Sequence, residues 1–275
     1  MTSEAKVAGH YTRGGLEETI LQAVVRMGLD PDRLSPIDLA PADEFHVGGL
    51  DATRELASQM DLAPGLQVLD VGSGIGGPAR FFAAEHQCRL TGIDLTEEFV
   101  QVARSLTRRT KLDHLAEFVQ GSALGMTFQA ETFDRAYMIH VGMNIADKAG
   151  VFREVRRVLK PGGKFAIFDF VRTSDVPITY PVPWAASEET SFVVGTGSYH
   201  DALEKGGFRL EQERTRTAFG IEFTERAMAR AAQNGQPALA LHLLMGELAP
   251  VMIKNVLMMM KQGVLAPVEL YARAA

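Results

Sequence analysis

The sequence predicts an α/β protein built on a doubly wound, mostly parallel sheet. Between residues 67 and 170, short apolar runs typical of buried strands alternate with longer amphipathic runs typical of helices. The first apolar run ends in a glycine turn, GSGIGG at 72–77, and the second ends in the carboxylate of Asp94. A parallel sheet with these features at neighbouring strand ends presents a crevice that suits a nucleoside.

The elements of this core follow in chain order. Thr96 and Asp147 each precede a predicted helix, and their side-chain oxygens are suited to accept hydrogen bonds from first-turn amides. Strands that alternate with helices lie parallel and are joined by right-handed crossovers. We expect helices near 77–87, 97–109 and 147–159, and strands over 67–71, 89–93, 116–120, 133–139 and 163–170.

Residues 1–60 are expected to form a helical lid on the main domain, which covers 61–275. An amphipathic helix is predicted over 15–27, where apolar side chains recur on one face. The proline-rich stretch 31–41 is predicted to be a loop, and 50–60 a second helix.

Several prolines change the pattern after residue 172. From there we expect a helix over 198–206, a sixth strand over 208–217, a helical segment over 224–262 and a final strand over 264–273.

Composition and charge limit the function. The 275 residues, 46% of them hydrophobic, suffice for one elaborated α/β domain. A net charge of −6, from 28 basic and 34 acidic residues, argues against a nucleic-acid partner. The single cysteine, Cys88, has no partner for an internal disulfide and is expected in the core.

Export and membrane signals are lacking. No apolar stretch approaches the roughly 20 residues that cross a bilayer, and the N-terminus carries no apolar export segment. We therefore expect a cytoplasmic protein without a membrane partner, either a monomer or a homodimer. No cluster of metal ligands stands out, and no metal is expected.

The residues around the glycine turn indicate which cofactor binds. Gly72, Gly74 and Gly77 satisfy the dinucleotide spacing G-x-G-x-x-G, which alone is a weak signal. Asp70 stands two residues before the first glycine, where a carboxylate repels a diphosphate but attracts a ligand with an ammonium and a sulfonium. This favours S-adenosylmethionine over NAD. Asp94 is spaced to accept hydrogen bonds from both ribose hydroxyls.

At this point the chain resembles the class I S-adenosylmethionine-dependent methyltransferases. The resemblance rests on VLDVGSGIGG at 68–77, GIDLT at 92–96, FDRAYMIH at 133–140 and LKPGGKFAIFDF at 159–170, in the family's order. It implies a seven-stranded Rossmann-like sheet whose last strand lies antiparallel beside the sixth, with a helical insertion at about 219–262. The cofactor contacts expected from the family and from the residues are Asp70, Gly72, Ser73, Gly74, Asp94, Leu95, Ser122, Ala123 and His140.

His140 ends the fourth predicted strand and is the first catalytic candidate. Its neutral pKa suits proton handling, so it is expected to act as a base, to orient the substrate or to contact the cofactor. The alternative is a histidine bonded to backbone at the edge of the sheet. Asn144 lies four residues on and is expected to bind a polar substrate group.

Tyr11 is the second catalytic candidate. Together with the glycine pair of FHVGG at 45–49, it is similar to the N-terminal elements of phosphoethanolamine and sarcosine/dimethylglycine N-methyltransferases. In those relatives a tyrosine closes over the cofactor and the glycine segment reaches the cofactor carboxylate. The chain departs from the phosphoethanolamine enzymes because Asn144 stands where they place a catalytic histidine. The alternative for Tyr11 is simple packing.

The acceptor pocket is expected near Trp184 and Glu188. A tryptophan followed by two carboxylates, Glu188 and Glu189, suits a methylated ammonium through cation–π attraction, so we expect an amine acceptor. The alternative for Trp184 is a hydrophobic anchor. Methionines at 245, 252 and 258–260 are expected to fill a helix core; if they line the pocket, the acceptor is larger and more apolar.

Three other functions stay open beside amine methylation. One is O- or C-methylation of an apolar natural product or a quinone-like acceptor. Another is an NAD-dependent oxidoreductase that uses the same glycine turn, and the last is a cofactor-binding protein without catalysis.

Overall fold

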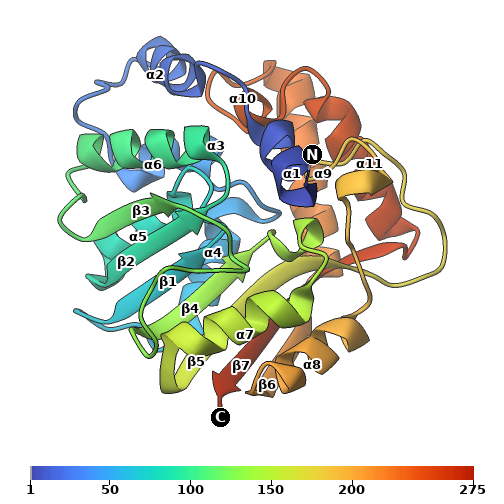
Figure 1. Ribbon diagram of the computed structural model, residues 1–275. Coiled ribbons are helices and arrows are strands. Elements are labelled where there is room, and N and C mark those ends of the chain that lie inside the picture. The colour runs from blue at the N-terminus through green and yellow to red at the C-terminus, as the bar shows by residue number, and fades with distance from the viewer. Residues whose placement is uncertain (1) are drawn as a thin grey trace.

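The computed structural model describes residues 2–275 and contains one seven-stranded sheet flanked by helices (Figure 1). The strand order is β3-β2-β1-β4-β5-β7-β6. The first five strands pair in parallel, and β7 runs antiparallel to both β5 and β6. The expected fold is confirmed. The strands are β1 (Gln67–Val71), β2 (Arg89–Asp94), β3 (Ala116–Gln120), β4 (Phe133–Ile139), β5 (Leu159–Arg172), β6 (Phe208–Thr215) and β7 (Leu265–Ala274).

Helices cover both faces of the sheet. On one face, α7 (Lys148–Val158) and α8 (Thr196–Lys205) pack on strand residues such as Leu69 and Phe165. On the other, α5 (Gly77–His86) and α6 (Glu97–Arg109) pack on residues such as Val68, and Cys88 lies in this core as expected. Alternate residues of β1 therefore enter different cores, as in a doubly wound sheet.

Four helices precede the sheet, two of them unexpected. These are α1 (Ser3–Tyr11), α2 (Leu16–Arg26), α3 (Pro36–Asp43) and α4 (Gly49–Ser58). The prediction of a loop over 31–41 was wrong in its second half. Ser35 and Asp38 form a reciprocal capping box, and Pro36 occupies the first turn, where its missing N–H costs nothing.

The caps of the core helices differ from expectation at one site. Asp147 caps α7 as predicted, since its Oδ1 accepts from the Gly150 amide at 2.7 Å. Thr96 precedes α6 but forms no side-chain cap. Its amide instead donates to Oδ1 of Asp94 at 2.8 Å, which ties the end of β2 to the start of the helix.

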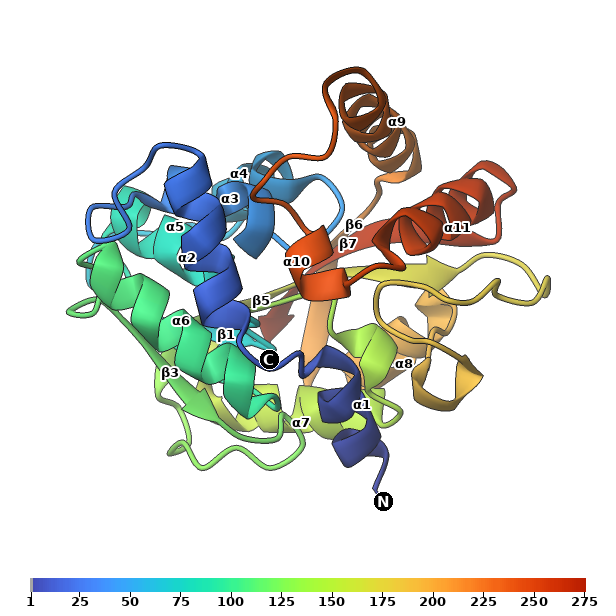
Figure 2. The ribbon, with the colours of Figure 1, turned by 90° about the horizontal axis from the view of Figure 1, so that it is seen from above.

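The segment between β6 and β7 is helical, as expected, and folds as three helices. They are α9 (Thr217–Asn234), α10 (His242–Met245) and α11 (Ala249–Lys261), and the first break falls at Gly235, with φ of 78°. Seen from above, α1, α2 and α10 lie over the strand ends, and α9 stands away from the body (Figure 2).

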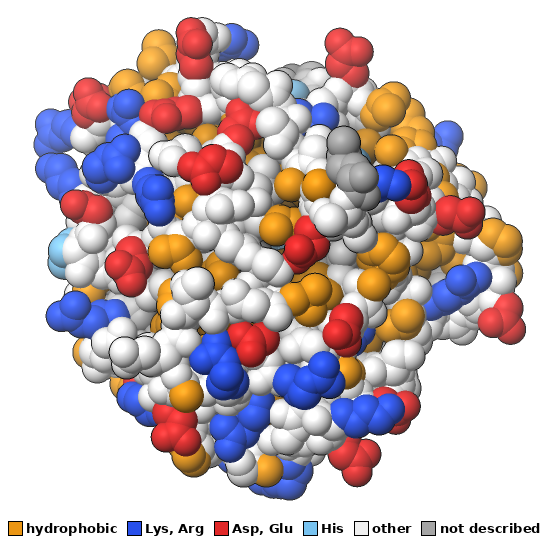
Figure 3. Space-filling model, in the orientation of Figure 1, with side chains coloured by type: hydrophobic (Ala, Val, Ile, Leu, Met, Phe, Trp, Pro, Cys, Tyr) orange, Lys and Arg blue, Asp and Glu red, His pale blue; other side chains and the backbone are white. Residues whose placement is uncertain are grey.

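No helix within residues 2–275 combines the length and hydropathy needed to span a membrane. On the face shown in Figure 3, basic and acidic side chains are interspersed.

Candidate functional site

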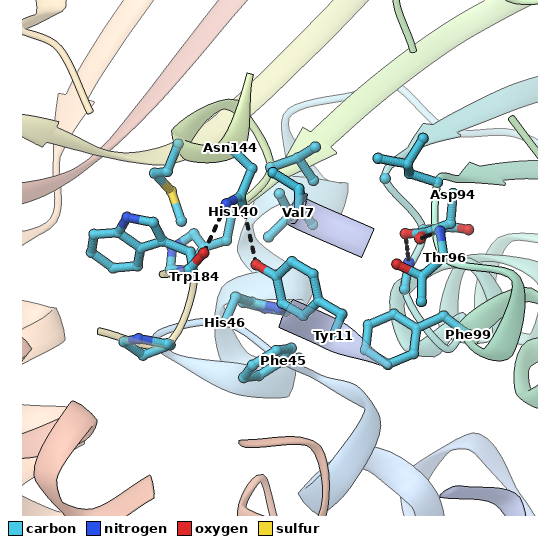
Figure 4. Close-up of a pocket in the computed structure, with 18 of the residues that line it drawn as sticks. Val7, Tyr11, Phe45, His46, Asp94, Thr96, Phe99, His140, Asn144 and Trp184 are labelled. Atoms are coloured by element: carbon cyan, nitrogen blue, oxygen red, sulfur yellow. Dashed lines mark hydrogen bonds between the residues drawn. The ribbon is translucent and has the colours of Figure 1, made fainter. Parts of the chain in front are cut away.

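A cavity of about 380 Å³ opens at the carboxyl ends of β1, β2 and β4. Its walls come from three parts of the chain: the glycine turn and strand ends, the N-terminal helices, and the insertion between β6 and β7. Figure 4 shows how aromatic side chains and Asp94 lie around it. This is the place where open α/β sheets bind ligands.

The glycine turn leaves its backbone open to the cavity. The amides of Gly72 and Ser73 both donate to the Ile93 carbonyl, at 2.8 and 3.0 Å, which holds the turn against β2. Gly74 has φ of 53°, and a Cβ built there would meet no atom within 4 Å. A ligand can therefore approach this backbone closely.

Asp94 lies at the end of β2 with both carboxylate oxygens held. Oδ2 accepts from the Gly74 amide at 2.8 Å, and Oδ1 accepts from the Thr96 amide. Burial raises the pKa of Asp94, against the effect of these two donors. Since each oxygen keeps further acceptor capacity, the oriented carboxylate suits a ribose diol.

Asp70 lines the cavity as a buried carboxylate without a cationic partner. Its side chain is almost fully buried, Oδ2 has no hydrogen-bond partner, and burial raises its pKa to about 7. The neighbouring buried cation, Arg80, is bonded to Asp43 at 2.7 Å. No Lys or Arg is among the described residues that line the cavity. A cationic ligand group would satisfy Asp70 at this position.

The remaining expected cofactor residues divide into two groups. Leu95, Ala123 and Ser73 line the cavity, and Oγ of Ser73 is buried without a partner. Ser122 does not line it, because its hydroxyl is bonded to Glu4 of α1 and accepts from the Leu124 amide at 3.1 Å.

Tyr11 and Asn144 connect the N-terminal helix to the far side of the cavity. The Tyr11 hydroxyl donates to Oδ1 of Asn144 at 2.8 Å (Figure 4). Nδ2 of Asn144 donates to the carbonyls of Trp184 and Thr190 at 2.8 and 3.0 Å. All the hydrogen-bonding groups of the Asn144 side chain thus have protein partners. The side chain links the loop after β4 to α1 and to the segment that contains Trp184 and Thr190.

Trp184 forms part of the wall as an anchored side chain. It is 2% exposed, stacks on Phe170 with 5.4 Å between ring centres, and donates from Nε1 to Oγ of Ser191. The structure does not bring Glu188 to the cavity: it lies exposed on the 3₁₀ helix Glu188–Thr190, and Glu189 pairs with Lys6. The carboxylates expected beside the tryptophan face solvent.

His140 lies at the end of β4 with its ring between two phenylalanines. Its ring centre is 5.0 Å from that of Phe168 and 4.9 Å from that of Phe170. Nε2 is buried without a partner, and burial together with the nearby His46 holds the pKa of His140 well below its usual range. His140 is therefore neutral near pH 7.

Two sets of functional residues were not predicted. His46 lines the cavity, and its ring is 5.9 Å from that of His140. Asp169 accepts from the Val141 and Gly142 amides, at 2.9 and 3.1 Å, and so fixes the loop after β4. The sequence held weak signals for both, a histidine before a glycine pair and an acidic residue within an apolar strand.

The insertion supplies an apolar end to the cavity. Met245 is the one methionine of the expected group that lines it; Met252, Met259 and Met260 are buried outside the lining, and Met258 is exposed. The other lining side chains from the insertion are Phe223, Thr224, Ala227, Leu241, Leu244, Ile253 and Val256.

Residues 69–167 match the model of a methyltransferase domain family. This segment is a methyltransferase domain. Sterol 24-C-methyltransferase from Schizosaccharomyces pombe is 36% identical over 166 residues, which make up 58% of this chain and 43% of the relative. The chain thus spans less than half the length of the curated relatives it matches.

Solved structures share the fold at low sequence identity. Phosphoethanolamine N-methyltransferase 2 from Haemonchus contortus has a TM-score of 0.73 at 20% identity, over 98% of this chain and 60% of its own. Geranyl diphosphate C-methyltransferase from Streptomyces coelicolor A3(2) has a TM-score of 0.72 at 15% identity, over 100% of this chain and 99% of its own. The comparisons confirm the expected fold, and for residues 69–167 they confirm the expected methyltransferase domain.

Proposed function

We propose that this protein transfers a methyl group from S-adenosylmethionine to an apolar small molecule. The observation that carries the proposal is the two-ended cavity. Its sheet end holds Asp70, Gly74 and Asp94, and its other end is lined by apolar side chains of the insertion. S-adenosylmethionine, when bound, supplies an electrophilic methyl group on a sulfonium.

The sheet end fits S-adenosylmethionine residue by residue. Asp94 would accept from the ribose hydroxyls, the Asp70 carboxylate would lie beside the cationic part, and Gly74 would let the ligand lie against the backbone. NAD fits less well, because its diphosphate would meet the carboxylates of Asp70 and Asp94 and no Lys or Arg among the described lining residues. The alternative of an oxidoreductase therefore finds no support in the site.

The charges of the lining disfavour an anionic acceptor. Since no Lys or Arg of the described chain lines the cavity, an acceptor with a phosphate group would have no counter-charge there. Two structural neighbours, a phosphoethanolamine and a geranyl diphosphate methyltransferase, are nevertheless named for phosphate-bearing compounds. The curated relatives named as sterol methyltransferases act on an apolar substrate class. An amine acceptor has lost its main support, because Glu188 and Glu189 lie outside the cavity.

The chain's own contribution to the reaction is positioning and the exclusion of water. Tyr11 and Asn144 hold α1 across the cavity, and Phe170 with Trp184 forms a dry aromatic wall. Methyl transfer is an in-line displacement with a good leaving group, so orientation in such an enclosure supplies much of the rate.

A screen with labelled S-adenosylmethionine tests the proposal. The acceptor arms are sterols, isoprenoid alkenes, quinones, phenols and small amines, each read by mass spectrometry of the product. Labelled product from an apolar arm supports the proposal. Product from amines alone would replace its acceptor class, and NAD binding in preference to S-adenosylmethionine would overturn it altogether.

A further inference from the structure

A buried group of three polar side chains begins at the cavity wall with His46 and continues behind it with Thr53 and Glu44. His46 is 6% exposed, Glu44 is 3% exposed and Thr53 is fully buried. Glu44 follows α3, His46 lies in the turn before α4, and Thr53 is on α4. Three segments of the lid thus bring a base, a hydroxyl and a carboxylate together.

The hydrogen bonds of His46 determine which ring nitrogen carries the proton. Nε2 lies 3.1 Å from the carbonyl of Gly49, and a carbonyl only accepts, so Nε2 must be the protonated nitrogen. In neutral His46 the free base is therefore Nδ1. Desolvation lowers the pKa of His46 to about 4, so the ring is neutral at pH 7.

Nδ1 is the ring nitrogen of His46 that other residues leave free. It has no hydrogen-bond partner among the described residues. It is also not fully buried, unlike the other unpartnered side-chain atoms of the site. Since His46 lines the cavity, Nδ1 is the ring nitrogen that is available to an acceptor bound there. Nε2 of His140, by contrast, is shielded.

On the Nε2 side of the ring, His46 is followed by the Thr53 hydroxyl and then by the Glu44 carboxylate. Oγ1 of Thr53 lies 3.2 Å from Nε2 of His46 and donates to Oε2 of Glu44 at 2.6 Å. Oε2 of Glu44 is itself 3.6 Å from Nε2. The Thr53 hydroxyl can therefore accept a proton from the ring and pass its own to the carboxylate.

We propose that His46 is the catalytic base of the methyl transfer and that Thr53 relays the proton to Glu44. This rests on the proposed function. The acceptor's electron pair forms the bond to the methyl carbon, and the pair of the broken carbon–sulfur bond stays on sulfur. The acceptor's proton goes to Nδ1, the Nε2 proton goes to Thr53, and the Thr53 proton goes to Glu44. His46 ends neutral, and Glu44 later releases one proton to water.

The charge state of Glu44 agrees with this role. Burial raises its pKa to about 8, so the carboxylate is available to receive a proton above that pH. Below it, Glu44 is already protonated and the relay has no terminal acceptor. The groups that face Glu44 are Asp43 and Asp70, which raise its pKa, Arg80 and the Thr53 hydroxyl, which lower it, and the neutral His46 and Tyr137.

Substitutions of His46 and Thr53, each paired with a control substitution, test the relay. We expect His46→Gln to lower turnover about 100-fold or more while affinity for S-adenosylmethionine, by calorimetry, stays within about twofold. His200→Gln, on α8 and outside the cavity lining, serves as the matched control. Thr53→Val, nearly the same shape, should lower turnover with folding intact, and Thr53→Ser should restore it.

Two readouts separate a relay from a purely structural role. Wild-type kcat/KM for the acceptor should rise with pH up to about 8. In Glu44→Gln, kcat/KM should no longer rise over this pH range. Nitrogen NMR of labelled histidine should show His46 protonated at Nε2 only, whether or not an acceptor is known. A proton on Nδ1, or full turnover in His46→Gln, overturns the relay; absence of transfer and of cofactor binding in the wild type refutes the proposed function instead.

Discussion

We expect the affinity for S-adenosylmethionine to depend on pH through Asp70. In the free protein, burial raises the pKa of Asp70 to about 7, so below that pH the group is mostly a neutral acid. A cationic ligand favours the carboxylate and lowers this pKa, so binding must release a proton. The affinity is then full above about pH 7 and falls as the pH drops below it.

The loss of affinity depends on how far the pH lies below the pKa of Asp70. If only the carboxylate binds, the affinity falls by a factor of about 1 + 10^(7−pH), roughly 100-fold at pH 5 and about 1.1-fold at pH 8. At pH 7 binding should release about half a proton per site. S-adenosylhomocysteine lacks the sulfonium charge and should show a smaller dependence.

Calorimetry in buffers of different ionisation enthalpy measures both quantities. Asp70→Asn should bind S-adenosylmethionine about 10- to 100-fold more weakly at pH 8, because the charge-assisted contact is lost. It should also lose most of the pH dependence, and Asp61→Asn, on an exposed carboxylate, is the control. Equal affinity and equal proton release in Asp70→Asn and wild type would refute the assignment of Asp70.

Three further variants probe the two ends of the cavity. Asp94→Asn should weaken S-adenosylmethionine binding by about 1–3 kcal/mol in calorimetry, and an unchanged affinity removes Asp94 from the ribose site. Gly74→Ala should weaken the same binding because its Cβ enters the cavity. Gly65→Ala, also at positive φ and in open space, should not weaken it. Equal affinities in the two variants would contradict a ligand at Gly74. Ala227→Trp should raise the KM for an apolar acceptor and leave cofactor affinity unchanged, while Ala229→Trp on the same helix should change neither. A normal KM in Ala227→Trp would move the acceptor away from α9.

The sheet was predictable because its signals are local. The run 68–71 is apolar except for Asp70 and is followed by glycine, so both the strand and the turn follow from neighbouring residues. Helix α3 was missed because prolines dominate 31–41, and the capping box of Ser35 with Asp38 was not weighed against them.

The cofactor end of the site was predictable for the same reason. Gly74, Asp70 and Asp94 come within one strand–turn–helix–strand segment, so spacing alone places them together. The structure places Ser122 outside the cavity lining, where its hydroxyl is bonded to Glu4, 118 residues earlier in the chain.

The acceptor end depends on contacts that no local pattern reveals. Glu188 follows Trp184 closely, yet the tryptophan turns inward to stack on Phe170 while the glutamate faces solvent. His46 is joined to His140 only by the fold, across 94 positions of sequence, and its role depends on bonds to Gly49 and Thr53.

A crystal structure of the protein with S-adenosylmethionine tests the central claim most directly. We predict that the ribose hydroxyls lie within hydrogen-bonding distance of Asp94, with the cationic methionine part beside Asp70 and the methyl group pointing toward the wall formed by His46 and Phe170. A ligand bound outside this cavity, or one whose ribose makes no contact with Asp94, would contradict the claim.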